Sequence, residues 1–296
     1  MKFKKSISRL VLLIAILALA ASIYGIFSSQ GKGQYDFKTI HDTSVTIYGK
    51  GLYQYDSISV ASQAVAQDIV TLFLGVPLLI LSLYLFRKGS LKGKLLLAGT
   101  IAYFLYTYTS YSFFSMFNRF FLIDVILMST SFFAFVLTMM SFDINNLSAY
   151  FSEKLPVKFV GGLLIFIGSV FGLMWLGTVA PSIMSGTTPT GLEHYTTLVI
   201  QAMDLGFVVP TAFLAGILLI KRKPFGYLLS SIVTVKAITM LTALTAMVIN
   251  QMLAGVEVNF AVLILIPVLN IIIIYSLYLI MKNIKEPKNT IEGLSN

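Results

Sequence analysis

Four ionisable side chains interrupt stretches of sequence that are otherwise long and apolar: Asp68, Asp124, Asp204 and Lys236. A charge inside a lipid bilayer is costly unless it is paired or hydrated, so such residues commonly mark an ion or substrate pathway. Lys236 lies about 16 Å from one end of its stretch and about 20 Å from the other, at 1.5 Å per helical residue. Its side chain is too short to cover either distance. The lysine is therefore expected to point into the protein and to need a partner there.

Asp204 is the acid that we expect to pair with Lys236. The two residues lie in adjacent apolar stretches joined by the short turn "KRKP", and Asp204 is the acid nearest to Lys236 in depth. Gln201 lies about one helical turn before Asp204. Tyr103 or Tyr106, both deep in an earlier stretch, is expected to donate a hydrogen bond. The sequence therefore predicts an Asp204–Lys236 ion pair.

The remaining polar candidates have simpler expected environments. Asp68 opens its stretch near the membrane surface, where hydration by water is expected. Asp124 follows Arg119 by five residues, a poor helical spacing for a pair, so at most a contact at the rim is expected. Asn270 follows Pro267 in the last stretch. Together the candidates predict a polar pocket in the outer half of the bilayer, and the full set for a substrate or ion pathway is Asp204, Lys236, Gln201, Tyr103, Tyr106, Asp68, Asp124 and Asn270.

Catalytic and metal chemistry have little support in the sequence. Both histidines, His41 and His194, lie outside the apolar stretches, and the motifs HExxH, GxSxG and GxxxxGK[ST] do not occur. Lys236 could serve as the base of a serine–lysine pair, but no serine is obviously placed to act as the nucleophile. With no cysteine in the chain, disulfides and thiolate metal sites are excluded. We expect no metal, no cofactor and no catalytic residue.

The composition explains why these charges matter. The chain has 296 residues, of which 57% are hydrophobic and only 11% are charged. A soluble protein normally carries about 25% charged residues, because its surface must be covered whatever the size of its core. The sequence therefore predicts an all-α integral membrane protein, a single membrane domain over residues 1–296, whose immediate partner is the lipid bilayer.

Eight stretches reach the roughly 20 apolar residues that a membrane-spanning helix needs. Their length argues against a β-barrel, whose strands alternate over much shorter segments. The third and fourth stretches are separated only by Asn118 and Arg119, which predicts a tight helical hairpin. The expected transmembrane helices are 10–28, 68–86, 95–117, 120–141, 159–178, 198–220, 225–249 and 259–281.

Positive charge predicts the orientation of these helices. Sixteen of the 21 Lys and Arg residues fall on one side of the predicted membrane, four fall on the other side, and Lys236 lies within it. Because Lys and Arg concentrate in cytoplasmic segments, both termini and the tail 282–296 are expected in the cytoplasm, with 29–67 and 179–197 outside the cell membrane. The same distribution accounts for the net charge of +9 without a nucleic-acid partner.

The first helix and the segment after it allow two interpretations each. The basic start, the apolar run and "ALAAS" resemble a cleavable signal peptide, but the apolar run continues to Phe27, which favours a retained helix over a cleaved one that would leave seven spans. In the extracytoplasmic loop 29–67, "SVTIYGKGLYQYDS" predicts a hairpin that turns at Gly49–Gly51. "ISVASQAVAQD" predicts a helical lead-in to the second span. The loop is interpreted as a packed lid or as a gate over a ligand.

The second and third spans weakly resemble the sixth and seventh spans. "GVPLLI" and "VVPTAF" align at an offset of 133 residues, which pairs Pro77 with Pro210. The same offset pairs Gly93 with Gly226. Four spans in each half, entering from the same side, would make a 4+4 parallel repeat.

Two functional hypotheses follow from these patterns, and a third has little support. The first is a small secondary transporter or carrier for an unknown small molecule or ion. The second is a membrane sensor or complex subunit whose buried charges only specify helix packing. An intramembrane enzyme is the third. A transporter should contain a polar, water-accessible cavity. A sensor or complex subunit whose charges specify helix packing should instead have tightly packed helix interfaces that exclude water.

Overall fold

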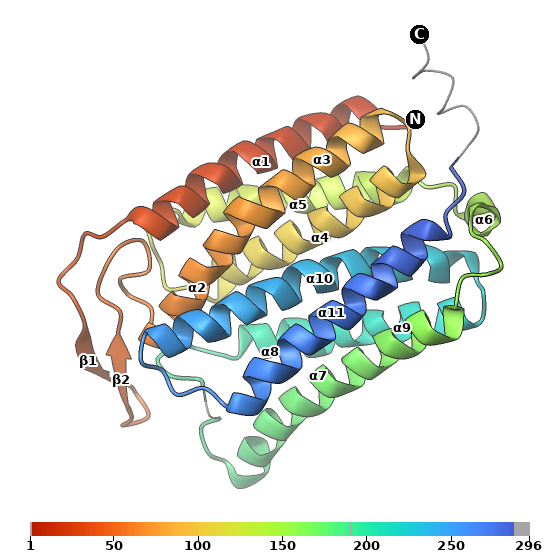
Figure 1. Cartoon of the computed structure of the whole chain (residues 1–296). Helices are drawn as coiled ribbons and strands as arrows, with labels where there is room; N and C mark the ends of the chain where they lie inside the picture. Colours follow the sequence, from red (N-terminus) through yellow and green to blue (C-terminus); the bar gives the residue numbers. More distant parts are fainter. Residues whose placement is uncertain (1, 190, 287–296) are drawn as a thin grey trace.

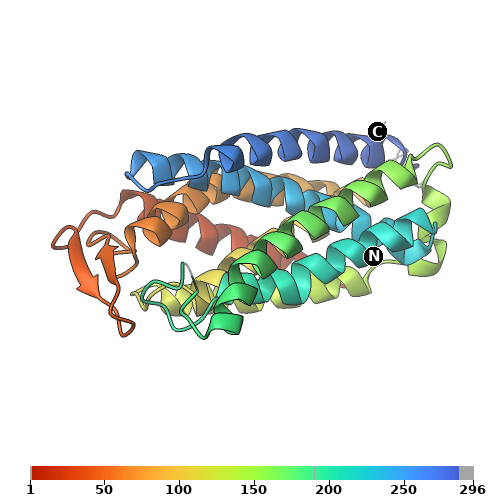
Figure 2. The same ribbon diagram turned by 90° about the horizontal axis from the view of Figure 1, so that it is seen from below.

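The computed structural model describes residues 2–189 and 191–286 as a bundle of long helices along one axis, with a small β-hairpin at one end (Figure 1, Figure 2). The first half contains α1 (Lys4–Phe27), β1 (Tyr35–Lys38), β2 (Ser44–Ile47), α2 (Ile58–Val70), the π-helical turn η1 (Thr71–Gly75), α3 (Val76–Arg87), α4 (Leu91–Phe113) and α5 (Phe121–Met140). A connection follows, with α6 (Ile144–Leu147) and a 3-10 turn at Ser148–Tyr150. The second half contains α7 (Val157–Ser185), α8 (Val199–Met203), the π-helical turn η3 (Asp204–Val208), α9 (Val209–Ile220), α10 (Pro224–Leu253) and α11 (Phe260–Lys282).

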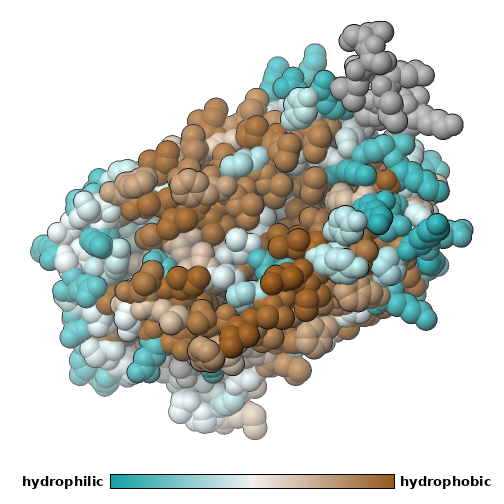
Figure 3. Space-filling model, viewed as in Figure 1, coloured by the Kyte–Doolittle hydropathy of each residue, from teal (hydrophilic) through white to brown (hydrophobic). Residues whose placement is uncertain are grey.

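Within the described residues, seven helical segments are long and apolar enough to cross a membrane. Two of them are the continuous segments Ile58–Arg87 and Val199–Ile220, and the other five are α1, α5, α7, α10 and α11. Figure 3 shows their apolar side chains as a belt between two hydrophilic ends of the molecule. The chain is therefore a helical multi-pass membrane protein, as its composition predicted.

Helix α4 has the length of a membrane span but a more polar sequence. Its 23 residues include the run "YFLYTYTSYS", and it lies inside the bundle against α3, α5 and α10. Tyr103, Tyr108, Thr100 and Thr107 are all buried on it. A helix that contacts other helices on most of its surface meets little lipid, so it can carry hydroxyl groups that a lipid-facing helix could not. This location explains why α4 is not among the seven most apolar segments.

A π-helical turn precedes a proline in each half of the chain. The Val76 N–H donates to the carbonyl of Thr71, and the Val209 N–H donates to the carbonyl of Asp204. In both cases the next residue is a proline, which has no N–H and whose ring crowds the carbonyl four residues earlier. The helix widens there by one residue. The two turns lie 133 residues apart, the spacing at which the prolines align in the sequence.

The helices of the two halves pack in a similar order, with one difference. In the first half α3 packs on α4, α4 on α5, and α1 on both α3 and α5. In the second half α9 packs on α10, α10 on α11, and α7 on α9. The positions of α7 and α11 correspond to those of α1 and α5, but α7 and α11 approach each other less closely over their described lengths than α1 and α5 do. The second half of the bundle is therefore less tightly closed on this side than the first half.

Helix α1 is an integral part of the bundle. One side of it is buried against α2, α3 and α5, through Ile7, Val11, Ile14, Ala18 and Ala21. The first helix thus contributes apolar side chains to the packed core.

The end of the bundle that carries β1 and β2, called here the hairpin end, differs from expectation in two ways. The β-hairpin forms between residues 35–38 and 44–47, with Tyr35 opposite Ile47, so the predicted turn at Gly49–Gly51 lies after it. The segment after Gly51 forms turns, which end at the Ser57 N-cap of α2. The helical lead-in to the second span is confirmed, since α2 begins at Ile58.

The connection between α4 and α5 is also longer than predicted. Helix α4 ends at Phe113 and α5 begins at Phe121, so seven residues connect them instead of a turn at Asn118 and Arg119. The connection is held to the neighbouring loop, because the Met116 N–H donates to the Asp56 carboxylate at 3.0 Å.

At the opposite end, the start of the predicted tail 282–296 folds back on the bundle. The carboxylate of Glu286 accepts hydrogen bonds from the Ser90 hydroxyl at 2.6 Å and from the Leu91 and Lys92 N–H groups at the start of α4. A carboxylate at this position stabilises the positive end of the helix dipole. Residues 287–296 of the tail lie outside the described residues.

Candidate functional site

A cavity of about 380 Å³ lies in the half of the bundle that is nearer the hairpin end. Its wall comes from α2, α4, α7, η3 and the neighbouring turns of α8 and α9, α10 and α11. Most of the lining side chains are apolar, and the polar and ionisable ones are Gln63, Gln67, Tyr106, Thr107, Ser110, Tyr111, Ser115, Trp175, Asp204, Lys236 and Gln251. A cavity of this size and composition is typical of small-molecule sites, which combine an apolar wall with a few placed polar groups.

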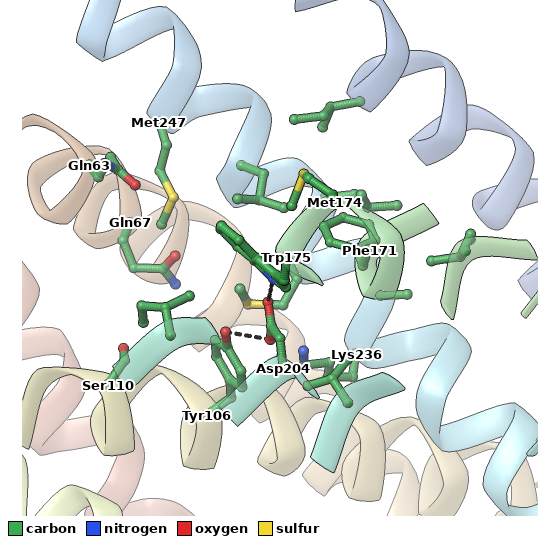
Figure 4. A pocket seen from close by; sticks show the side chains of 18 of the residues that line it. Gln63, Gln67, Tyr106, Ser110, Phe171, Met174, Trp175, Asp204, Lys236 and Met247 are labelled. Carbon is green, nitrogen blue, oxygen red and sulfur yellow. Dashed lines mark hydrogen bonds between the residues drawn. The ribbon is translucent and has the colours of Figure 1, made fainter. Parts of the chain in front are cut away.

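Asp204 is the centre of the polar wall. It is the first residue of the π-helical turn, and its side chain is 8% exposed. Its two carboxylate oxygens accept one hydrogen bond each, from the Tyr106 hydroxyl at 2.8 Å and from the Trp175 indole N–H at 2.8 Å (Figure 4). The predicted donation from Tyr106 is therefore present. The carboxylate joins three helical segments that lie far apart in the sequence.

Lys236 lines the same cavity, but it does not form the direct ion pair that the sequence suggested. Its Nζ lies 4.0 Å from the centroid of the Tyr106 ring, a cation–π contact. Within the described residues, the only salt bridge is the exposed pair of Lys38 and Asp42. Tyr106 therefore contacts both residues, with its ring against Lys236 and its hydroxyl on Asp204. Within the described residues, the Lys236 ammonium group forms no salt bridge, so its N–H donors remain available for another acceptor.

Trp175 is the site residue that the sequence interpretation missed. It is the only tryptophan in the chain, and the span that carries it, 159–178, was not assigned to the pocket. A tryptophan inside an apolar helix needs an acceptor for its indole N–H, and that requirement was the available signal. The acceptor itself is 29 residues away, which no local pattern reveals.

A second, neutral polar cluster adjoins the cavity in the first half of the chain. The Gln67 side-chain amide donates to the Tyr103 hydroxyl at 2.6 Å and to the Thr107 hydroxyl at 3.1 Å. The Tyr103 and Thr71 hydroxyls lie 2.8 Å apart. Gln67 also keeps a buried carbonyl oxygen that has no donor among the described residues. Tyr103 therefore serves this cluster and does not contact Lys236.

Asp68 is buried, which contradicts the expected hydration. It is 1% exposed and accepts hydrogen bonds from the Tyr53 hydroxyl at 2.6 Å and from the Tyr111 hydroxyl at 3.3 Å. Gly25 of α1 leaves the space for it, because a Cβ at that position would lie 1.9 Å from an Asp68 carboxylate oxygen. Asp68 thus links the loop after β2 to α2 and α4 and lies against Gly25 of α1; it does not itself line the cavity, although its donor Tyr111 does.

The three remaining candidates do not line the cavity. Asp124 is 4% exposed on α5, and Arg119 contacts the Tyr24 hydroxyl instead, so no rim pair forms between the two. Asn270 donates to the Thr242 hydroxyl at 2.9 Å, between α11 and α10. Gln201 lies on α8 next to the site, although Ile200 and Asp204 face the cavity in its place.

A further cluster joins the two long connections at the hairpin end. Asp56 is 1% exposed and accepts hydrogen bonds from the Tyr195 hydroxyl at 2.9 Å and the Met116 N–H at 3.0 Å. Burial raises the pKa of Asp56 from 3.8 to about 7, the nearby charge of Glu193 adds to the rise, and the two hydrogen bonds oppose it. Burial also raises the pKa of Glu193. His194 contacts the Tyr55 carbonyl at 3.0 Å beside this cluster.

The hairpin end is expected to become less stable as the pH rises from about 4 to about 7. A carboxyl group whose pKa is higher in the folded protein stabilises the fold while it is protonated, and this stabilisation is lost as the group ionises. Each unit of pKa difference corresponds to about 1.4 kcal/mol. Thermal unfolding midpoints across this range should fall with pH, and Asp56→Asn should reduce the slope, leaving the smaller contribution of Glu193. A wild-type profile that rises with pH, or a variant with the same slope, would contradict the assignment.

Comparison with known proteins adds no assignment to these observations: no protein family, curated protein or solved structure matches the chain. Within the described residues, no group of His, Asp and Glu side chains is arranged to hold a metal ion.

Proposed function

We propose that the chain is a small secondary transporter or carrier of the cell membrane, and that its substrate occupies the cavity between Tyr106, Trp175, Asp204 and Lys236. The observation that carries the proposal is Lys236, an ammonium group that lines a cavity between apolar helices and has no carboxylate in contact with it. An ionisable residue that faces the interior of a membrane protein commonly belongs to a substrate or ion pathway. The cavity provides the space that such a substrate needs.

A parallel repeat would support this function, because many carriers are built from two related halves. At the spacing of 133 residues between the π-helical turns, Thr71 aligns with Asp204 and Tyr103 aligns with Lys236. In the first half the two aligned residues are neutral and their hydroxyls bind each other. In the second half they are charged and flank Tyr106. We therefore infer a 4+4 repeat of eight spans, including α1 and α4, in which the second half has acquired the charged site.

The carrier hypothesis predicts a cavity that small polar reagents can reach. Because the chain has no cysteine, single cysteines can be introduced without background. Ser110→Cys, which lies in the cavity wall, should react with a small charged thiol reagent, and Ser131→Cys, at a fully buried position on α5, should not. Equal protection of both positions would contradict a carrier.

The second hypothesis, a sensor or complex subunit without transport, is favoured by the apolar character of most of the cavity wall and by the two protein donors on Asp204. On this hypothesis the polar wall holds helices together and excludes water. Protection of Ser110→Cys from the charged reagent would support it.

The proposed topology places both termini in the cytoplasm and the hairpin end outside. Ile40→Cys, at a position 94% exposed between β1 and β2, should react with a membrane-impermeant thiol reagent in intact cells. Lys154→Cys, exposed at the opposite end of the bundle, should react only after the cells are permeabilised. The reverse pattern of labelling would invert the topology.

A further inference from the structure

The cavity is open sideways, between two helices that diverge. The rings of Phe159 on α7 and Tyr275 on α11 lie 6.1 Å apart, near the end of the bundle opposite the hairpin. From there the two helices separate toward the hairpin end, as Figure 2 shows. Both helices line the cavity in the separated part, through residues 164–175 and 262–269.

Side-chain exposure identifies the same opening. Among the described lining residues, only Met174 of α7 and Leu265 of α11 are largely exposed, with 42% and 45% of their surface accessible. The two residues lie on the two helices that border the gap. The surface around them is apolar, with Leu173 71% exposed and Ile264 52% exposed. An opening with such a rim faces hydrocarbon more readily than water.

The interior of the cavity has two unlike regions. Near the opening the wall consists of apolar side chains such as Phe171, Val262 and Ile266, and at the far side Lys236 presents its ammonium group. A lysine ammonium carries three N–H donors. No protein acceptor is bound to those donors within the described residues. A molecule that fits both regions has a hydrocarbon part and one acidic group.

We propose that the cavity binds an amphiphile with one hydrocarbon chain and a carboxylate headgroup, which enters from the bilayer between α7 and α11. The carboxylate binds Lys236 through charge-assisted hydrogen bonds, and the chain follows the apolar wall toward Met174 and Leu265. A volume of about 380 Å³ is near the lower limit of ligand sites, which range from roughly 300 to 1,000 Å³. The size favours one chain over the two chains of a membrane phospholipid. This inference rests on the proposed substrate site and specifies its ligand.

Trp175 provides a direct test, because it is the only tryptophan and lines the cavity. In phosphatidylcholine nanodiscs, stearic acid brominated in the middle of its chain should quench Trp175 fluorescence saturably, and unbrominated stearic acid should reverse the quenching. Lys236→Met should weaken the apparent affinity about tenfold or more, because a charge-assisted hydrogen bond is lost. Lys236→Arg should retain most of the affinity for the brominated acid. Lys221→Met, which removes an exposed lysine outside the cavity, should leave the affinity unchanged.

The route is tested with a double variant, Met174→Cys with Leu265→Cys. Treatment with a short bis-maleimide should join α7 to α11 and slow the onset of quenching relative to either single-cysteine variant treated in the same way. An unchanged rate after complete cross-linking would overturn access from the bilayer.

Other outcomes separate this inference from the proposed function. Quenching that is equally strong with brominated phosphatidylcholine, and that unbrominated stearic acid does not reverse, would reflect surrounding lipid and overturn the inference. If the charged thiol reagent modifies Ser110→Cys while brominated stearic acid has no effect, the cavity is a site for another ligand and only the ligand class is wrong. If neither probe reaches the cavity, both proposals fail.

Discussion

Asp204→Leu is expected to destabilise the protein by about 3–5 kcal/mol, as commonly found when one member of a buried charged group is removed. Leucine has no acceptor, so the Tyr106 hydroxyl and the Trp175 N–H lose their partners, and Lys236 loses the nearest negative charge. Asp204→Asn keeps the size and can still accept from Trp175 while donating to Tyr106. Its expected cost is smaller, about 1–3 kcal/mol. Equilibrium unfolding in mixed micelles measures both values.

The combination of Asp204→Asn with Lys236→Met distinguishes a functional site from a packing contact. The double variant should be more stable than Asp204→Asn alone, because it contains no uncompensated charge, with a coupling energy of about 0.5–3 kcal/mol. If the pair serves a substrate, the double variant folds but no longer binds the ligand that the wild-type protein binds. If the pair only specifies packing, stability and function return together. Additive effects of the two substitutions would show that Tyr106 insulates the charges from each other.

Gly161→Val is expected to separate α7 from α9 and to cost about 2–3 kcal/mol, in the range found for overpacked contacts. A Cβ at position 161 would lie 2.7 Å from the carbonyl oxygen of Gly216, and a Cβ at 216 would lie 2.5 Å from the carbonyl oxygen of Gly161. Two backbones this close have no side chain that could move aside. Small residues at such contacts are a common means of helix association in membranes.

Gly162→Val is the matched control for this prediction. It lies next to Gly161 on the same helix, and a Cβ there would meet no atom within 4 Å. Gly162→Val should unfold at nearly the temperature of the wild-type protein, whereas Gly161→Val should unfold at a lower temperature. Gly161→Val should also shift the fluorescence emission of Trp175, because α7 holds that residue against Asp204. Equal effects of the two substitutions would mean that the close contact of α7 with α9 does not limit stability.

The class of the protein and the approximate place of nearly every helix could be predicted from the amino-acid sequence. Apolar runs of spanning length are a local property, because each spanning helix satisfies its own backbone hydrogen bonds. The π-helical turns also have a local cause, in Pro77 and Pro210. Helix boundaries were less accurate where a helix continues beyond the predicted apolar run, as in α7, which ends at Ser185 and not at residue 178.

The composition of the candidate site was only partly predictable. Asp204, Lys236 and Tyr106 stand out in the sequence, because each is polar inside an apolar run. Trp175 stands out less, since aromatic residues are common in membrane helices and the acceptor of its indole N–H lies 29 residues away in the sequence. Gln67 was hidden for a related reason, as it lies in the helical lead-in that looked like part of the outer loop.

The contacts that these groups make with one another depend on how the helices pack in three dimensions. Pairing two charges by depth suggested a direct contact of Lys236 with Asp204, but depth says nothing about rotation around the bundle. In the structure Lys236 lies against the Tyr106 ring, and Asp204 accepts from the Tyr106 hydroxyl. From its position in the sequence, Asp68 was expected to lie at the membrane surface and to be hydrated. In the structure it lies against Tyr53 and Gly25 and is enclosed by them. The gap between α7 and α11 depends on the angle between two helices that are equally apolar along their lengths. Such angles arise from packing between distant segments, which no local pattern in the sequence encodes.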